Sequence, residues 1–123
     1  MGCDIHMVVE KKENSKWRCL LNPNESFRDR NYNLFAKLGN VRNYHEIIPL
    51  SDNRKTPSDS CKEWKKYAKS WGSDLHSTSH LYLSELELSL DIYENWDKFV
   101  KTLEEHSNSP NKDDIRIVFA FDN

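Results

Sequence analysis

Cysteine is scarce in this chain and forms no paired motif. The three cysteines among 123 residues, Cys3, Cys19 and Cys61, are far apart and include no CxxC pair. An odd number of cysteines without a disulfide framework is typical of a reducing compartment rather than of secreted proteins. We therefore expect a cytoplasmic protein.

Long apolar runs are missing as well. No stretch approaches the roughly 18 apolar residues that a transmembrane helix needs. Near the start of the chain, Asp4 and His6 interrupt the apolar residues, and no small-residue cleavage site follows, so we expect no signal peptide. These absences argue against a membrane as partner.

The charge has no dominant sign. Charged residues make up 31% of the chain, yet the formal net charge is only -2. A dedicated nucleic-acid binder usually shows a basic excess or a basic stripe, so nucleic acid is not the expected partner. One local basic set remains: Arg28, Arg30, Arg42, Arg54 and Lys55.

Familiar catalytic motifs are absent too. The chain contains no P-loop, GxGxxG, HExxH or EF-hand pattern, and no GxSxG elbow. No individual residue is therefore predicted to be catalytic, and binding is favoured over catalysis. A candidate site has to be inferred from clusters of polar side chains.

The chain does contain enough bulky apolar material for one core. Its four Trp, five Tyr and five Phe residues each bury a large area and offset a modest aliphatic content. A length of 123 residues fits one domain rather than two. We therefore treat residues 1–123 as a single domain.

The first ten residues, MGCDIHMVVE, are the most informative segment. Successive side chains of a strand point to opposite faces, so Asp4 and His6 would stand side by side on one face. The other face would be apolar: Cys3, Ile5, Met7 and Val9. A turn over 13–16 and a return strand over 17–21 would complete a hairpin.

Helical and extended patterns follow one another along the rest of the chain. They predict helices over 32–38, 61–71 and 93–105, strands over 75–83 and 115–121, and a long polar loop over 43–59. Ser60 and Glu63 match a capping box for the second helix. The expected fold class is α+β, with a small, mostly antiparallel sheet made of the N-terminal hairpin plus the C-terminal strand, packed with three or four helices.

One hypothesis for the polar residues is a divalent metal site. Its ligands would be Asp4, His6, His76 and His80, with Asp74 or Asp122 as further candidates. Such ligands suit zinc, manganese or iron, and an open coordination position would activate water. On one strand His76 and His80 would share a face but lie about 13 Å apart, so only a helical 76–80 segment suits a shared ion. The sequence therefore allows a divalent metal as cofactor but does not identify one.

The other hypothesis is a site for a phosphorylated or nucleotide-derived ligand. Arginine forks hold phosphate oxygens in pairs, tyrosine rings offer a stacking surface, and asparagine amides read polar edges. The residues assigned to this site are Asp4, His6, Arg28, Arg30, Asn31, Tyr32, Arg42, Asn43, His76 and His80. The alternative is structural, with Arg28 paired to a carboxylate such as Asp29 and Tyr32 packed inward.

Three sequence blocks also stand out together: MGCDIH at 1–6, RNYNLFA at 30–36 with VRN at 41–43, and RIVFAFDN at 116–123. They resemble a family of small uncharacterised proteins found largely in bacteriophage and prophage genomes, which also have a Ser/His-rich segment before a helix, matched here at 76–80. The match departs at 37–39, where the family has a smaller turn. The resemblance implies a phage context and the host bacterial cytoplasm, and it carries no settled activity.

Small phage accessory proteins often counter host defences, some by trapping nucleotide signals, so analogy favours that class. The leading hypothesis is a small soluble phage protein that binds a phosphorylated or nucleotide-derived ligand and sequesters a host antiviral immune signal. Two alternatives stay open: a phosphoesterase-like, metal-dependent hydrolase that uses the His/Asp cluster, and a protein–protein inhibitor of a host defence protein that docks through the 43–59 loop. The sequence also leaves a homo-oligomer open.

Overall fold

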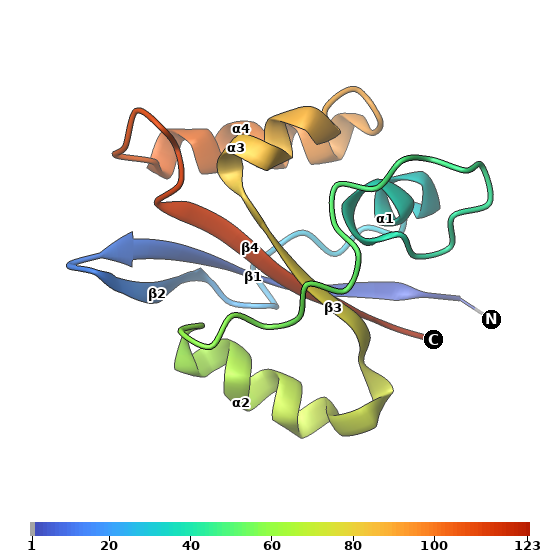
Figure 1. Ribbon diagram of the computed structural model, residues 1–123, viewed down its shortest axis with the longest axis horizontal. Coiled ribbons are helices and arrows are strands. Elements are labelled where there is room, and N and C mark those ends of the chain that lie inside the picture. The colour runs from blue at the N-terminus through green and yellow to red at the C-terminus, as the bar shows by residue number, and fades with distance from the viewer. Residues whose placement is uncertain (1) are drawn as a thin grey trace.

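The N-terminal hairpin and the C-terminal strand lie side by side in one antiparallel sheet (Figure 1). The computed structural model describes residues 2–123, and the strand order is β2-β1-β4-β3. The strands are β1 (Asp4–Glu13), β2 (Lys16–Leu21), β3 (His76–Tyr82) and β4 (Ile115–Asp122). The predicted α+β class is confirmed.

Helices cover both faces of this sheet (Figure 1). One face carries α1 (Tyr32–Gly39), α3 (Leu83–Leu86) and α4 (Glu94–His106), and the other carries α2 (Lys62–Trp71). Two 3-10 turns, η1 (Gly72–Asp74) and η2 (Glu87–Ser89), follow α2 and α3. Within the described part of the chain, no helix is long and apolar enough to cross a membrane.

A two-residue turn joins β1 to β2. Its residues, Asn14 and Ser15, both have positive φ angles, 51° and 66°. Such a turn twists in the same sense as the flanking strands. The two strands therefore extend closer to the turn than the sequence predicted, to Glu13 and from Lys16.

β4 lies in the middle of the sheet, between β1 and β3, and corresponds to the strand predicted over 115–121. Every residue from Ile115 to Phe121 is buried. Ile117 and Phe119 pack into the core under α1 and α4, whereas Val118 packs against α2. Because both faces of β4 are covered, the strand needs a nearly continuous run of apolar residues.

A buried ion pair interrupts the apolar packing under α2. Glu10 Oε1 accepts a hydrogen bond from Arg116 Nε at 2.6 Å, and neither residue is more than 1% exposed. Glu10 Oε2 accepts from Ser60 Oγ at 2.5 Å and from the backbone N–H of Cys61 at 2.7 Å. Arg116 also donates to Asp59 Oδ1 at 3.0 Å. We call these five residues the Glu10 network.

The capping box predicted for Ser60 and Glu63 is wrong. The N-cap residue of α2 is Cys61, and its side chain forms no capping hydrogen bond with the helix. Ser60 Oγ donates to Glu10 instead of accepting a hydrogen bond from the helix. A carboxylate from β1 therefore lies at the start of α2, where the helix dipole favours negative charge, and fastens the helix to the sheet.

β3 contains a β-bulge near its start. Ser77 has a φ of 55° there, and the extra residue reverses the alternation of side chains along the strand. His76 is consequently paired with Phe121, and His80 is paired with Val118 on the opposite face. The prediction that His76 and His80 share a face is wrong for this reason.

Residues 40–61 contain no helix or strand, as predicted for the 43–59 loop. Part of this segment covers the outer edge of β3, because Lys55 N donates to Thr78 O at 2.8 Å. His80 Nδ1 also lies 2.9 Å from Lys55 O. The covered edge is protected from pairing with a further strand.

Candidate functional site

A cleft of about 580 Å³ opens beside the C-terminal half of α2 and the start of β1. It is lined by Asp4, Ile5, His6, Pro23, Asn24, Arg28, Asp29, Tyr67 and Trp71. Asp4, His6 and Arg28 belong to the ligand-binding set predicted from the sequence. The volume lies within the range of roughly 300–1,000 Å³ that is usual for ligand pockets. We call it the His6 cleft.

Both ring nitrogens of His6 are engaged. Nε2 lies 2.7 Å from Asp122 Oδ2, and Nδ1 lies 2.6 Å from Tyr67 Oη. A carboxylate accepts hydrogen bonds, so in the neutral ring Nε2 carries the hydrogen and Nδ1 accepts from the Tyr67 hydroxyl. The Trp71 ring packs against the imidazole, with the centroids 4.5 Å apart. We call Asp122, His6, Tyr67 and Trp71 the His6 network.

Tyr67 lines the His6 cleft together with His6 and Trp71. Burial raises the pKa of Tyr67, outweighing the interaction with the Trp71 side chain, and the charge of Asp122 adds to the rise. The hydroxyl is therefore protonated at neutral pH and can donate a hydrogen bond to His6. Only 11% of the His6 side chain is exposed, so this bond is largely shielded from solvent.

A second hollow, of about 390 Å³, adjoins the His6 cleft and shares Trp71 with it. Its lining consists of Gly2, Trp71, Ser73, Asp74, His76, Asp122 and Asn123. His76 Nε2 lies 2.6 Å from Asn123 Oδ1. His76 thus comes close to the His6 network without binding to it.

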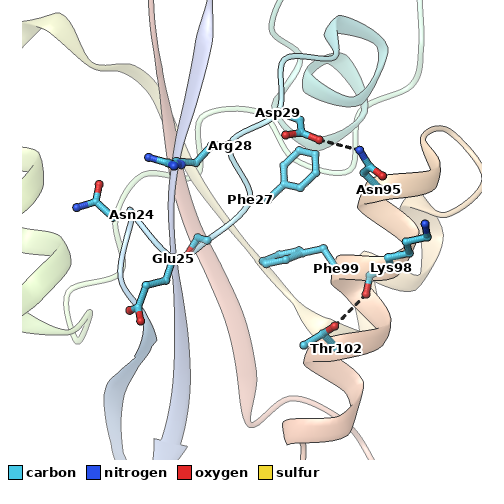
Figure 2. Close-up of a pocket in the computed structure, with 10 residues that line it drawn as sticks. Asn24, Glu25, Phe27, Arg28, Asp29, Asn95, Lys98, Phe99 and Thr102 are labelled. Carbon is cyan, nitrogen blue, oxygen red and sulfur yellow. Dashed lines mark hydrogen bonds between the residues drawn. The ribbon is translucent and has the colours of Figure 1, made fainter.

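Arg28 and Asn24 present polar groups to the His6 cleft from the connection between β2 and α1. Neither side chain forms a hydrogen bond or an ion pair with the described residues. Figure 2 shows that both point away from α4, whereas Phe27 points toward Phe99 of that helix. Phe27 is buried, with its ring 5.8 Å from that of Phe99. Phe27 therefore anchors the segment, and Arg28 extends from the opposite side.

The pairing of Arg28 with Asp29, which the sequence allowed, does not form. Asp29 Oδ2 accepts hydrogen bonds from Tyr93 Oη and Asn95 Nδ2, each at 3.0 Å, and Figure 2 marks the second of them. These bonds hold the Asp29 carboxylate toward α4. The Arg28 guanidinium is left available for an anion in the cleft.

Arg30 lies at the edge of the His6 cleft through its contact with Asp4. Its Nε and Nη2 both donate to Asp4 Oδ1, at 3.1 and 2.8 Å. The guanidinium also lies against Gly2, where an added Cβ would come within 2.3 Å of Arg30 Nη1. Arg30 therefore offsets the negative charge of Asp4.

Tyr32 and Arg42 lie on the other side of β1, near α1. Tyr32 Oη accepts a hydrogen bond from Cys3 N at 3.1 Å, and the Arg42 guanidinium lies 5.2 Å from the centre of the Tyr32 ring. Cys3 belongs to the core under α1 and α4, whereas the next residue, Asp4, lines the His6 cleft. Contrary to the single site expected from the sequence, the structure does not bring Tyr32 and Arg42 together with Arg28.

Asn31 and Asn43 hold the backbone. Asn31 Oδ1 accepts from Leu34 N at 3.0 Å and so caps α1. Asn43 Oδ1 accepts from Ile47 N at 2.8 Å, and its Nδ2 donates to Ile47 O at 2.7 Å. Their amides satisfy local backbone groups, which is the usual role of asparagine at caps and turns.

His80 is separate from the His6 cleft, because its Nδ1 is engaged by Lys55 O beside β3. His6 already uses both nitrogens, and His76 bonds to Asn123 and Ser77. Among residues 2–123, no group of three or more His, Cys, Asp or Glu side chains is arranged to hold a metal ion. The four ligands predicted for a metal ion therefore do not form one site; they are Asp4, His6, His76 and His80.

Sequence reasoning missed Tyr67 and Trp71 as site residues. With Trp64 and Ala68 they repeat at i, i+3, i+4 and i+7, a spacing that predicts the apolar face of the 61–71 helix rather than a site. A tyrosine in an apolar stripe carries a hydroxyl that needs a partner, and this was the one signal that pointed to Tyr67. Its partner, His6, lies 61 residues away in the sequence.

Comparison of the chain with protein-family models, with curated proteins and with solved structures found no match. The resemblance to phage proteins therefore rests on its sequence blocks alone.

Proposed function

We propose that this protein binds a small phosphorylated or nucleotide-derived ligand in the His6 cleft. One observation carries the proposal: an exposed guanidinium, that of Arg28, faces a cleft of ligand size and has no hydrogen-bonding partner among the described residues. Arginine side chains bind phosphate oxygens in pairs through charge-assisted hydrogen bonds. An anionic group is the complement that this arrangement favours.

Other groups in the His6 cleft suit a nucleoside next to the phosphate. Trp71 and Tyr67 line the cleft with aromatic rings, and aromatic rings stack on any base. The Asn24 amide, also without a hydrogen bond to the described residues, can read polar edges of a base or a ribose. A guanidinium for phosphate, two aromatic rings for a base and one amide for polar edges together favour a nucleotide over inorganic phosphate.

The phage context is the basis for the biological half of the proposal. The blocks at 1–6, 30–43 and 116–123 resemble small phage proteins, and analogy with phage accessory proteins suggests that the ligand is a host antiviral immune signal. In this proposal the protein acts in the host bacterial cytoplasm and lowers the free concentration of the signal by binding it.

Isothermal titration calorimetry tests the binding step. The probes are ADP-ribose, a 3′,3′-linked cyclic dinucleotide and a linear dinucleotide, with adenosine and inorganic phosphate as controls. We expect one of the nucleotides to bind and adenosine to bind far more weakly. No heat with any nucleotide at high protein concentration would contradict the proposal.

A matched pair of arginine variants locates the ligand. Arg28→Ala should weaken nucleotide binding by roughly 10- to 100-fold, since it removes a charge-assisted hydrogen bond. Arg42→Ala should leave the affinity nearly unchanged, because Arg42 lies over Tyr32 on the other side of β1. The reverse result would place the ligand near α1 instead.

Exposed apolar side chains favour a second candidate function, the inhibition of a host defence protein. Tyr44 and Ile48 are 66% and 81% exposed, and Asn43 holds the loop between them in a fixed shape through two bonds to Ile47. Exposed apolar groups that lie close together often mark protein contacts. The double variant Tyr44→Ser/Ile48→Ser should lose a stoichiometric partner captured from host lysate if this function holds.

A further inference from the structure

The Tyr67 hydroxyl stands where an activated nucleophile would stand. Tyr67 lines the His6 cleft, and its hydroxyl lies 2.6 Å from His6 Nδ1. On the far side of the ring, Asp122 Oδ2 accepts from Nε2 at 2.7 Å. A carboxylate that orients an imidazole, which in turn accepts the proton of a hydroxyl, is the arrangement that generates a nucleophile in hydrolases.

Asp122 and Trp71 hold His6 in this orientation. Asp122 Oδ1 accepts a second hydrogen bond from Asp4 N at 3.3 Å, so its carboxylate is fixed from two sides. The Trp71 ring covers the imidazole at 4.5 Å, and only 11% of the His6 side chain is exposed. The base is therefore largely shielded from water, while Tyr67 lines the cleft.

We propose that the His6 cleft cleaves a phosphodiester bond, with Tyr67 as the nucleophile, His6 as the base and Asp122 as the residue that orients the base. The proposal rests on the proposed binding of a phosphorylated ligand and adds a reaction to it. It differs from the metal-dependent hydrolase considered above, because the nucleophile is a side chain of this protein.

The reaction has two balanced steps. Tyr67 Oη attacks phosphorus and its proton passes to His6 Nδ1, while the bond from phosphorus to the leaving oxygen breaks and that oxygen takes a proton from solvent. Water then attacks phosphorus and gives up a proton to solvent, and the bond from phosphorus to Tyr67 Oη breaks as His6 returns its proton to that oxygen. The sum is hydrolysis of a phosphodiester to a phosphomonoester and an alcohol.

Arg28 supplies the charge that such a transition state needs. Its guanidinium shares the His6 cleft with Tyr67 and has no hydrogen-bonded partner among the described residues. Negative charge builds on the phosphoryl oxygens during the attack, and a prepositioned cation stabilises it. The raised pKa of Tyr67, which burial causes, explains why a base is needed at neutral pH.

Hydrolysis of bis(4-nitrophenyl) phosphate in the presence of a chelator is the direct test. The wild-type protein should release 4-nitrophenol, and Tyr67→Phe should lower the rate on the order of 1,000-fold or more. Tyr44→Phe, which removes an exposed hydroxyl on the 43–59 loop, is the control and should keep the full rate. Equal rates for wild type and Tyr67→Phe would overturn the proposal.

The covalent intermediate gives a readout that needs no variant. Mass spectrometry of wild-type protein quenched during turnover should show one 4-nitrophenyl phosphoryl group on the peptide that contains Tyr67. Absence of both turnover and adduct, with nucleotides still binding in the calorimeter, would end the catalytic proposal and leave the binding function standing. Absence of nucleotide binding as well would end both.

Discussion

Two polar networks lie on the same face of the sheet, under the same helix, and differ in how far they are closed. The Glu10 network joins β1 and β4 to the start of α2, and Glu10 and Arg116 are at most 1% exposed. The His6 network joins the same two strands to the end of α2, yet 22% of the Asp122 side chain is exposed. The buried Glu10–Arg116 pair closes the first network, although its Asp59 side chain is 64% exposed and Ser60 and Cys61 line a separate hollow of about 630 Å³. The His6 network has no such buried ion pair, and His6, Tyr67 and Trp71 line the His6 cleft.

The closed network satisfies its charges within the protein. Both carboxylate oxygens of Glu10 accept hydrogen bonds, and the Arg116 guanidinium also stacks on Trp17 at 3.8 Å. Desolvation of such a pair is costly, so its geometry has to be nearly complete. In the His6 network, by contrast, the Tyr67 hydroxyl and the nearby Arg28 remain within reach of a ligand. The difference separates a structural fastening from a candidate site.

Arg116→Met should produce the largest loss of stability. The substitution leaves Glu10 buried without its cation, and breaking a buried pair in this way costs about 3–5 kcal/mol. Urea denaturation measures the free energy of unfolding. The double variant Glu10→Gln/Arg116→Met should recover part of the loss, because the amide oxygen still accepts from Ser60 and Cys61 and no buried charge remains. A single variant as stable as wild type would show that the Glu10 network is not closed.

His6→Ala should cost less stability, about 1–3 kcal/mol, because water can reach the partners that it leaves behind. It should nevertheless weaken nucleotide binding, because Tyr67 and Trp71 lose the ring that they contact, and it should abolish turnover, because the base is removed. His45→Ala, at an exposed position in the 43–59 loop, is the matched control and should change neither quantity. Comparable losses of binding in both histidine variants would remove the functional distinction between the two networks.

The pH dependence of the free energy of unfolding should depend on the two thiols near the start of α2, those of Cys19 and Cys61. Burial raises the pKa of Cys61 to about 12 and the pKa of Cys19 to about 11, from 9.0. The unfolded chain loses these protons near pH 9 while the folded protein keeps them, so the free energy of unfolding should be highest below pH 9 and fall as the pH rises toward 11 and 12. Urea titrations at each pH should show a shallower decline for Cys19→Ala/Cys61→Ala. An identical slope would contradict the burial of these thiols.

Asp4→Asn should have the smallest effect on stability. Asp4 and Arg30 are about half exposed, at 51% and 49% of their side chains, and exposed ion pairs contribute about 0–1 kcal/mol. The melting temperature should therefore change little. A loss as large as that of Arg116→Met would mean that the Asp4–Arg30 pair is part of a closed network after all.

Alternation along β1 was enough to place Asp4 and His6 on one face and Cys3, Ile5, Met7 and Val9 on the other, and the apolar C-terminal run was enough to predict a strand there. The sequence could not reveal the bulge at Ser77, because one extra residue in β3 leaves no periodic signal that separates it from a regular strand. It was this bulge that put His76 and His80 on opposite faces.

The sequence also did not predict most hydrogen-bond partners of the polar residues. Asn31 and Asn43 bond to backbone groups three and four residues ahead, contacts that spacing in the sequence can indicate. Asp29 accepts from Tyr93 and Asn95, 64 and 66 residues away, and these partners depend on distances in space. The hydroxyl of Tyr67 indicated that it needs a polar partner, but the sequence could not identify that partner as His6, 61 residues away. Composition and periodicity therefore predicted the helices and strands of this protein better than the residues that line its cleft.

NMR of the four tryptophan indole N–H signals tests whether the ligand binds in the His6 cleft. The protein is titrated with the nucleotide that binds most tightly in the calorimeter. Trp71 lines the His6 cleft, Trp17 stacks on Arg116 in the Glu10 network, and Trp64 and Trp96 are fully buried. We expect the Trp71 signal to shift and saturate while the other three stay nearly fixed. A saturating shift of Trp17 with Trp71 unmoved would contradict this expectation.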